Sequence, residues 1–464
     1  MAGSGTWLGA LPARCGCCLG RVPNLNAPGE RLKVLHFSAL DGETGAGIAA
    51  ARIHEGLLAR GVQSRFCVAY PVAGLTNAFT PPITTLGRAA RRVCHALDKW
   101  MLGHAAAGYD YVLSTGACGF DIGEIVRAER PDIVQLHWIA GNTFRLSSIA
   151  SIAGPIVWRL SDQWPFCGVQ HLEPDPNTYT NPPRPVPWVQ RRKHISEHVR
   201  HRKQAIYASV KNLTLACPSR WLASETKRSA LLRERPIELI PTSCDTDAFA
   251  IKDRVACRAA LGLSPDKRII LIGATSMATK WKGPDLFVES IARLCSTSAD
   301  LLPVQIVTFG KDPFDASSLG GSVEVTHLGQ IKDRRLMSIL YGAADVFAAP
   351  SRMENLSNAV LEALASGTPV VAFAIGGMPD MIDHQANGFL ARPFEPSDFA
   401  NGLRFALQQR ERPEIRAVCR QKVLNGFSRE QEIERYISLY GRLLSTEPAP
   451  QESRASAPAR VSAG

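Results

Sequence analysis

Short apolar runs of the kind found in buried strands alternate with helical patterns along this chain, and the alternation starts twice. The first series of runs is Val34–Phe37, Gln63–Val68, Ile133–Leu136, Ile156–Trp158 and Leu213–Cys217. The second is Arg268–Ile272, Val304–Phe309, Val323–Leu328, Val346–Ala349 and Val370–Phe373. Continuous apolar runs indicate strands covered on both faces, as in parallel sheets. We therefore predict an α/β fold of two doubly wound, Rossmann-like domains facing each other across a cleft.

The predicted boundaries follow from this alternation. Residues 31–248 form the N-terminal domain and residues 249–425 the C-terminal domain, joined near Ile240–Phe249. The pattern from Arg412 to Leu444 is helical, and we assign residues 426–445 to a C-terminal helix. Residues 1–30 are predicted to be a flexible leader, because no basic segment precedes their apolar patch. Residues 446–464, rich in Pro, Ala and Ser, are predicted to be a disordered tail.

Charge is distributed unevenly between the two halves. Of the formal net charge of +11, residues 1–250 carry +9 (28 basic against 19 acidic) and the remainder carries +2 (25 against 23). No run of about 18 apolar residues occurs, which excludes a transmembrane helix of ordinary composition. The 12 cysteines form no matched C-x2-C pairs, so structural zinc is not expected. Their scatter favours a reducing compartment, and we expect a cytoplasmic protein.

Open parallel sheets bind ligands at the carboxyl ends of their strands, and a glycine pair lies at the first such place. Residues 45–50 fit the dinucleotide pattern G-x-G-x-x-A. Six residues separate the strand from these glycines, and Phe66–Tyr70 has no acidic residue, which disfavours a dehydrogenase. Gly45 and Gly47 would still let backbone amides approach a phosphate at a helix N-terminus. A glycine-rich helix start without a ligand is the alternative.

Two glutamates eight residues apart lie after the predicted strand Val346–Ala349. Glu354 precedes a helix that Ser357 or Asn358 could cap, and Glu362 lies two turns inside it, about 12 Å away. Carboxylates accept hydrogen bonds from pairs of sugar hydroxyls, and free amides at a helix start suit a diphosphate. A solvated helix face is the alternative interpretation, and the small apolar neighbours disfavour it.

Two lysines follow the first strand of the second series. Lys280 and Lys282 come after the loop 273–279, at the carboxyl end of that strand. Lysine binds phosphate as a point charge, so either residue could serve a phosphate group there. Taken alone, a loop lysine is more often an ordinary surface residue.

The run from Glu354 to Gly377 resembles the signature of the retaining glycosyltransferases of family 4, which have the two-Rossmann-domain fold called GT-B. The E-x7-E pair, the sequence Ala-Ser-Gly-Thr-Pro-Val-Val and the Gly376-Gly377 turn are all present. Matches in the same order extend over roughly residues 32–440, among them Gly45–Ala50, Cys217–Trp221 and Lys282-Gly283. The segment from Trp158 to His171 resembles a subgroup that builds bacterial surface polysaccharides.

The resemblance implies an enzyme of the hexosyltransferase type, which moves a sugar from a nucleotide-sugar donor to a glycan or lipid-linked acceptor with retention of configuration. It implies no metal and no cofactor. Glu354 would contact the donor sugar, Glu362 the ribose, and Lys282 the departing diphosphate, where charge stabilisation is most needed. Further donor-binding candidates are Lys280, Gly45, Gly47, Asn355, Leu356 and Ser357.

The chain departs from the family at two positions. Met277 stands where the family usually has arginine, and Lys280 is the candidate substitute. Ser161 stands where many members have the histidine that faces the donor sugar. His171 is therefore our candidate for a catalytic histidine, and Asp162 and His137 are candidates on the sugar and acceptor side. These departures leave an inactive relative acting as an assembly partner as one alternative; an epimerase or a phosphorylase of the same fold is another.

Two basic segments indicate a partner for the N-terminal half. Arg88–Lys99 belongs to an amphipathic helical pattern with Val93, Leu97 and Trp100 on one stripe. Arg184–Lys203 has seven basic residues and one acidic residue. Such surfaces suit anionic lipids, so we expect peripheral contact with the inner face of the cytoplasmic membrane. Nucleic acid is not expected, because no recognition fold accompanies the charge. Ordinary solvated charge is the alternative.

Overall fold

The structure is a computed structural model. It describes residues 31–39, 44–70, 74–106, 109, 111–277, 279–301, 303–312 and 323–445. The predicted leader 1–30 and tail 446–464 lie outside the described residues, as do Cys15, Cys17 and Cys18.

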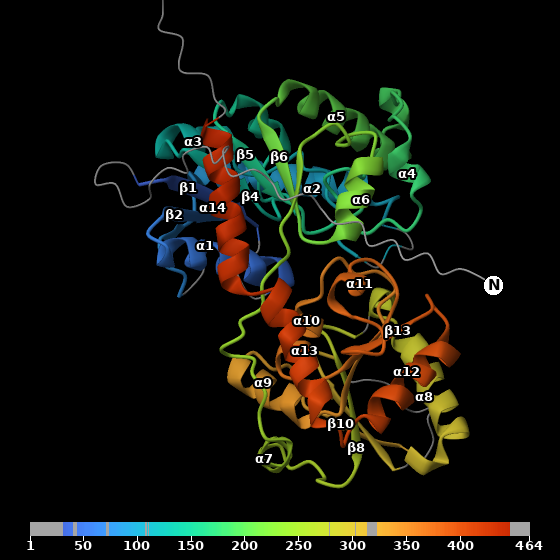
Figure 1. The fold of residues 1–464 in the computed structure, drawn as a ribbon. Coiled ribbons are helices and arrows are strands. Elements are labelled where there is room, and N and C mark those ends of the chain that lie inside the picture. Colours follow the sequence, from blue (N-terminus) through green and yellow to red (C-terminus); the bar gives the residue numbers. More distant parts are fainter. Residues whose placement is uncertain are drawn as a thin grey trace, which may run out of the picture.

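The N-terminal unit is built on a parallel sheet of seven strands in the order β3-β2-β1-β4-β5-β6-β7 (Figure 1). The strands are β1 (Lys33–Ser38), β2 (Gln63–Val68), β3 (Ala78–Phe79), β4 (Ile133–Leu136), β5 (Ile156–Arg159), β6 (Leu213–Cys217) and β7 (Ile237–Leu239). The strand order reverses direction between β1 and β4. The carboxyl ends of these two strands therefore flank the point where open sheets bind ligands.

The C-terminal unit repeats this arrangement with six parallel strands in the order β10-β9-β8-β11-β12-β13. They are β8 (Arg268–Gly273), β9 (Val304–Phe309), β10 (Val323–His327), β11 (Val346–Ala349), β12 (Val370–Phe373) and β13 (Gly388–Ala391). Here the order reverses between β8 and β11. The two predicted lysines follow β8, and Glu354 follows β11.

The predicted fold class is confirmed, since both sheets are parallel and doubly wound. Three strands were missed: β3, β7 and β13. They lie at the ends of the strand orders, at the edges of the two sheets. None has a continuous apolar run: β3 has two residues, β7 contains Glu238, and β13 begins with Gly388.

Helices cover both faces of each sheet. The N-terminal unit has α1 (Gly45–Ala59), α2 (Thr85–Leu102), α3 (Ile122–Glu129), α4 (Asn177–Thr180), α5 (Ile195–Ser209) and α6 (Arg220–Arg228), with 3-10 turns η1 (Leu146–Ser151) and η2 (Trp188–Gln190). The C-terminal unit has α7 (Arg254–Ala260), α8 (Pro284–Thr297), α9 (Arg334–Ala343), α10 (Asn358–Ala365), α11 (Met378–Met381), α12 (Pro396–Gln408) and α13 (Pro413–Gly426), with η3 (Lys280–Lys282) and η4 (Ala299–Leu301). The last helix is α14 (Arg429–Ser445).

The C-terminal helical segment consists of two helices, and the predicted C-terminal helix 426–445 corresponds to the second of them. α13 ends at Gly426, and α14 begins at Arg429. Phe427 is buried at the break, where its backbone NH still bonds to the Val423 carbonyl at 2.8 Å. The break lets α13 pack against α10 in the C-terminal unit while α14 returns to α1 in the N-terminal unit (Figure 1).

α14 completes the core of the N-terminal unit. Its buried Ile433, Tyr436 and Leu439 pack in one cluster with Ile53 and Leu57 of α1. Tyr440, on the same face, is fully buried, and its hydroxyl donates to the side-chain oxygen of Gln135 on β4 at 2.9 Å. A segment that lies last in the sequence thus covers one face of the first sheet.

We predict that Tyr440→Ala lowers the free energy of unfolding by about 3–5 kcal/mol, because it leaves a cavity and an unpaired Gln135 amide oxygen. Tyr440→Phe keeps the ring and should cost only about 1 kcal/mol. Urea denaturation followed by circular dichroism measures both. Equal stability of the alanine variant and the wild type would show that α14 is not part of the folding core.

Candidate functional site

Two helix N-termini, one from each unit, meet between the two sheets. α1 begins at Gly45 and α10 at Asn358, and the Asn358 side-chain amide donates to the Gly45 carbonyl at 3.1 Å. At α1, the Thr44 hydroxyl accepts from the Gly47 NH at 3.3 Å. At α10, Ser357 occupies the N-cap position predicted for it, but its side chain accepts no hydrogen bond from the helix. Helix N-termini carry partial positive charge, so this junction suits an anion.

Glu362 lies behind this junction and is held by a residue of the other unit. The Arg52 guanidinium of α1 is 3.4 Å from one Glu362 carboxylate oxygen, and the Tyr341 hydroxyl is 3.4 Å from the other. Arg52 also donates to the Ser243 carbonyl at 2.6 Å. Burial raises the pKa of Glu362, while Arg52 and Arg334 act in the opposite direction. Glu362 is thus a preorganised carboxylate at the joint between the two units.

Lys282 and Glu354 contact each other directly. The Lys282 ammonium donates to a Glu354 carboxylate oxygen at 2.7 Å, and both side chains remain partly exposed. Lys280 lies two residues earlier, at the start of the same 3-10 turn, η3. Gly283 ends η3 with φ of +64°, and a Cβ there would lie 2.1 Å from the Pro350 carbonyl oxygen. The close packing of these two loops fixes the distance between lysine and glutamate.

Arg352 ties the same two loops together. Its guanidinium forms a bidentate pair with Asp285 at the start of α8, at 2.6 and 2.7 Å. The Arg352 NH also bonds to the Trp281 carbonyl at 2.8 Å. The hydrogen bond from Arg352 lowers the pKa of Asp285. A bidentate pair of this kind adds geometric definition to the loop that carries Glu354.

The Gly376-Gly377 turn supports Glu354 from the opposite side. Gly376 has φ of +52°, and a Cβ there would lie 1.8 Å from the Glu354 carbonyl oxygen. The Gly377 NH donates to that same oxygen at 3.2 Å. Any larger residue at position 376 would displace the backbone of Glu354.

Asn355 connects the two units. Its side-chain amide donates to the Ser161 carbonyl at 3.0 Å and accepts from the Ser219 hydroxyl at 2.7 Å. The Asn355 side chain is therefore occupied by the N-terminal unit, and Leu356 is half-buried against the C-terminal core. A donor-binding role of Asn355, Leu356 and Ser357 would therefore rest on their backbone amides.

Asp162 and His171 form a polar network at the carboxyl end of β5. His171 is fully buried; its Nδ1 is 2.6 Å from an Asp162 carboxylate oxygen, and its Nε2 is 2.9 Å from the Ser114 hydroxyl. The Trp138 indole NH donates to the same Asp162 oxygen at 2.8 Å. Both ring nitrogens of His171 thus have protein partners. The arrangement suits a residue that positions Asp162 and Trp138 better than one that touches a substrate.

His137 lies in the interior of the N-terminal unit. Its Nε2 is 2.9 Å from Nδ1 of His36, and neither ring reaches solvent. The nearby His54 bonds to the Ser64 hydroxyl and the Thr76 carbonyl, both at 2.6 Å. Burial lowers the pKa of His36 and His137 well below the ordinary value, and neighbouring charges act in the same direction. The structure thus places His137 in a neutral, buried histidine cluster.

The two departures from the family have different surroundings. Met277 is buried in the core of the C-terminal unit, so its side chain faces away from the loop surface. The Ser161 hydroxyl accepts from Arg159 at 3.0 Å.

Two tyrosines near these loops were not singled out from the sequence. The Tyr109 ring lies 6.3 Å from that of Trp281 on η3, and the half-exposed Tyr111 ring lies 6.4 Å from His171. The segment is held there by the antiparallel pairing of Leu113 with Gln170 and by the Tyr109 hydroxyl, which donates to the Leu172 carbonyl at 2.9 Å. These contacts join residues far apart in sequence, so no local pattern indicates them.

The lysines and arginines of Arg184–Lys203 do not form one surface. Lys203 is fully buried, and its ammonium donates to the carbonyls of Trp164, Cys167 and Gly168. Arg200 is also buried. The prediction of a continuous basic surface is wrong for these two, because their charges satisfy interior carbonyls and carboxylates. Arg191 and Lys193 are exposed, and Arg192 is half-buried.

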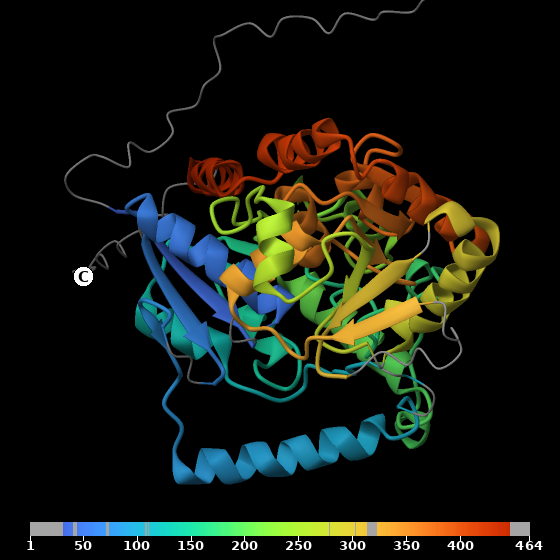
Figure 2. The same ribbon diagram turned by 90° about the horizontal axis from the view of Figure 1, so that it is seen from below.

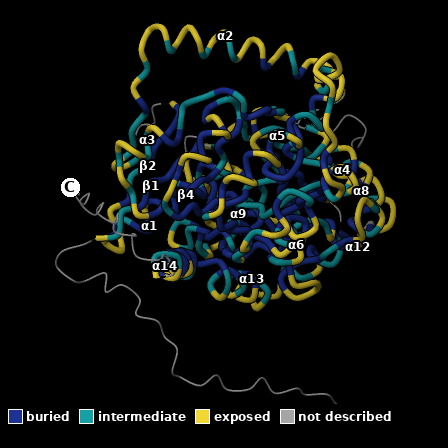
Figure 3. The backbone as a smooth tube through the Cα atoms, turned by 90° about the horizontal axis from the view of Figure 1, so that it is seen from above, coloured by how far each residue is buried: buried dark blue, intermediate teal, exposed yellow. Residues whose placement is uncertain are grey.

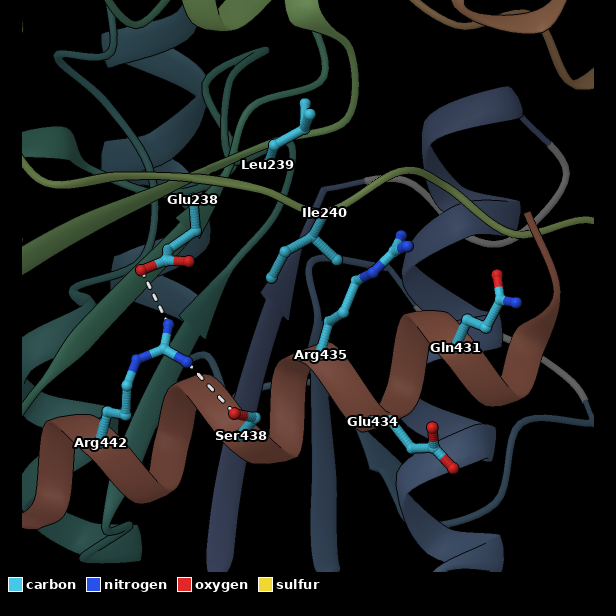
Figure 4. Close-up of a pocket in the computed structure, with 8 residues that line it drawn as sticks. All are labelled: Glu238, Leu239, Ile240, Gln431, Glu434, Arg435, Ser438 and Arg442. Atoms are coloured by element: carbon cyan, nitrogen blue, oxygen red, sulfur yellow. Dashed lines mark hydrogen bonds and ion pairs between the residues drawn. The ribbon is translucent and has the colours of Figure 1, made fainter. Parts of the chain in front are cut away.

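A hollow of about 420 Å³ lies elsewhere, between the end of β7 and α14 (Figure 4). Arg442 bridges Glu238 at 2.8 Å and Ser438 at 3.2 Å along its floor. None of its lining residues is among the predicted site residues.

Within the described ranges, no helix is long and apolar enough to cross a membrane, and no group of three or more His, Cys, Asp or Glu side chains is arranged to hold a metal ion.

Comparison with known families gives a match to the C-terminal unit. The model of the family Glycosyl transferases group 1 matches residues 266–409. This match covers less than a third of the chain. D-inositol 3-phosphate glycosyltransferase of Mycobacteroides abscessus is 30% identical over 219 residues, which are 46% of this chain and 48% of that protein. The enzyme of the same name from Nocardia farcinica is 32% identical over 186 residues, 38% of this chain and 41% of that protein. The chain thus matches about half the length of these curated relatives.

Solved glycosyltransferase structures share the fold of nearly the whole chain. A glycosyltransferase from Rickettsia africae has a TM-score of 0.60 at 15% identity, covering 90% of this chain and 100% of that one. Anabaena HepE in complex with UDP and glucose has a TM-score of 0.57 at 16% identity, covering 89% and 100%. The two Rossmann-like sheets of this chain therefore share the GT-B fold of these solved structures.

The buried histidine cluster predicts acid sensitivity. His36 and His137 stay neutral in the folded protein but take up protons near pH 6.5 when unfolded. Below that pH the unfolded state binds more protons, so stability should fall as pH falls, by at most about 1.4 kcal/mol per pH unit for each histidine. Urea denaturation at pH 7.5 and 5.5 measures the effect.

The double variant H36F/H137F should lose most of this pH dependence, whereas His201→Asn, at an exposed position of α5, should keep it. An unchanged pH dependence in the double variant would mean that other groups cause the acid sensitivity.

Proposed function

We propose that this protein is a retaining, metal-independent glycosyltransferase that moves a sugar from a nucleotide-sugar donor to a glycan or lipid-linked acceptor. The observation that carries the proposal is the convergence of the N-termini of α1 and α10 beside the Lys282–Glu354 pair. This junction offers amides and an ammonium for a diphosphate, and carboxylates for hydroxyl groups, within one small region.

Each group has a task in the proposed reaction. Lys282 and the helix N-termini stabilise negative charge on the diphosphate as the bond to the sugar breaks. Glu354 accepts hydrogen bonds from donor-sugar hydroxyls, and Glu362 accepts them from the ribose. Donor binding would separate Lys282 from Glu354, because each takes a ligand group in place of the other. Attack by the acceptor on the same face of the sugar then needs no protein nucleophile.

Relatives and structural neighbours guide the choice of substrates to test. The matched relatives are named D-inositol 3-phosphate glycosyltransferases, and HepE has been solved with UDP, glucose and UDP-glucose. We propose a UDP-sugar as the first donor to test. For the acceptor we propose surface-polysaccharide intermediates at the inner face of the cytoplasmic membrane, with D-inositol 3-phosphate as the competing candidate.

The Cys94–Cys118 disulfide bears on the proposed location. Such bonds are rare in reducing compartments, so the disulfide does not fit the expectation of a reducing compartment that we drew from the scattered cysteines. The other cysteines within the described ranges are free thiols, and all except Cys295 are buried.

We expect saturating UDP or UDP-glucose to raise the Tm by roughly 3–5 °C, because a ligand at 100 times its Kd adds about 2.7 kcal/mol to the stability. Lys282→Met should abolish most of this shift by removing the charge that meets the diphosphate. Lys211→Met changes an exposed lysine of the N-terminal unit and should leave the shift intact. Absence of any shift with UDP-, GDP- and ADP-sugars would favour the inactive-relative alternative.

Glu354→Gln should reduce kcat/KM for sugar transfer by on the order of 100-fold, since it replaces a charged acceptor by a neutral amide of the same shape. Glu289→Gln, an exposed glutamate of α8 paired with Arg293, should have no effect. NMR of the product should show the anomeric configuration of the donor. Full activity of Glu354→Gln would contradict the role of Glu354, and an inverted product would contradict retention.

A further inference from the structure

Helix α2 stands apart from the body of the molecule. Figures 2 and 3 show it running along one side of the N-terminal unit, with its outer side free of other described segments. Of its 18 residues, only Asp98 and Leu102 are buried. A helix of this length that packs on a core normally buries a full stripe of side chains.

The side of α2 that faces the body is firmly attached. Cys94 forms a disulfide with Cys118, and both Thr115 and Asn142 donate hydrogen bonds to the Asp98 carboxylate. The Arg91 guanidinium lies 4.1 Å from the centre of the Phe120 ring. These contacts set the orientation of the helix, and therefore decide which residues face outward.

The outward residues form an apolar row. Leu86, Val93, Leu97 and Trp100 are 81%, 61%, 59% and 56% exposed. Their spacings of seven, four and three residues place them on one side of a helix that turns about 100° per residue. The stripe that the sequence pattern predicts for an amphipathic helix thus faces solvent in the structure.

A second row on the same helix is basic. Arg88, Arg92 and Lys99 are exposed and repeat at spacings of four and seven residues, along the other side of the outward surface. The exposed alanines Ala89 and Ala96 lie between the two rows. The outward surface of α2 thus combines an apolar row, a narrow strip of small residues and a basic row.

The turn η2 extends this surface beyond the end of α2. The Arg192 guanidinium lies 4.5 Å from the centre of the Trp100 ring, and its Nε donates to the Trp100 carbonyl at 3.2 Å. Next to Arg192 are Trp188, 78% exposed, and Val189, 69% exposed. Two exposed tryptophans therefore lie near each other within a basic environment.

We propose that the outward surface of α2 and the turn η2 form a docking surface for anionic phospholipid, with the apolar row inserted at the level of the headgroups. Lipid fits both rows at once: apolar side chains enter the acyl boundary, tryptophan favours the interface, and basic side chains meet phosphate groups. The net charge of +9 on residues 1–250 adds long-range attraction to such a surface. Any role of this surface in bringing a lipid-linked acceptor to the enzyme rests on the proposed function. The binding of the surface to lipid does not depend on that function.

Vesicle co-sedimentation without donor or acceptor tests the proposal on the full chain. The wild type should bind vesicles of phosphatidylcholine and phosphatidylglycerol (7:3) and bind pure phosphatidylcholine much more weakly. V93S/L97S should lower the partition coefficient at least about tenfold, since two apolar side chains no longer enter the lipid. R88S/R92S should lower binding to the anionic vesicles only.

The matched control is V255S/V418S, which changes two exposed apolar residues of the C-terminal unit and should bind as the wild type does. Circular dichroism and the nucleotide thermal shift verify that each variant is folded. The proposal would be overturned if the wild type did not bind anionic vesicles, or if V93S/L97S bound them as well as the wild type does. It would also be overturned if light scattering showed a dimer that V93S/L97S dissociates, because the surface would then belong to a contact with a second copy of the chain. Because no sugar transfer is measured, failure here is distinct from failure of the proposed function.

Discussion

The contact between Arg52 and Glu362 is the constraint on which the arrangement of the two units depends. A buried carboxylate is costly unless a charge or hydrogen-bond donor compensates it, and here the compensating charge comes from the other unit. The same contact keeps the start of α1 opposite the start of α10, where the Asn358 amide reaches the Gly45 carbonyl. The ion pair of Arg52 with Glu362 thus holds the positively polarised N-termini of α1 and α10 toward each other.

The loops around this junction are held by contacts of several kinds. Gly376 and Gly377 allow backbone to pack against Glu354 where no side chain would fit. The bidentate pair of Arg352 with Asp285 fixes the loop that carries Glu354 to the start of α8. Asn355 joins the same loop to Ser161 and Ser219 of the N-terminal unit. The geometry of Lys282 and Glu354 therefore depends on contacts from both sheets.

The fold was predictable because strands buried on both faces leave a strong local signal. The runs Val304–Phe309 and Leu213–Cys217, for example, have the predicted bounds in the structure. The separation of α13 from α14 also has local signals, since Gly426 ends α13 and the Ser428 hydroxyl accepts from the Gln431 NH at 3.3 Å. Glu354 and Glu362 could be singled out by their spacing, and Lys282 was preferred to Lys280 through the resemblance to the family. Arg52 as the partner of Glu362, and the burial of His137 and Lys203, depend on contacts between residues far apart in sequence, and no local pattern records them.

The crossings of the chain between the two units have a structural consequence. The chain passes from the first unit to the second after Cys244 and returns after Phe427, and at this neck the Cys244 NH bonds to the Phe427 carbonyl at 2.8 Å. Because α14 then rejoins the first unit, the C-terminal unit is topologically an insertion whose two ends lie side by side. Insertions with adjacent ends are well tolerated in folded domains. The C-terminal unit can therefore be replaced by a related one without altering the core that α14 completes.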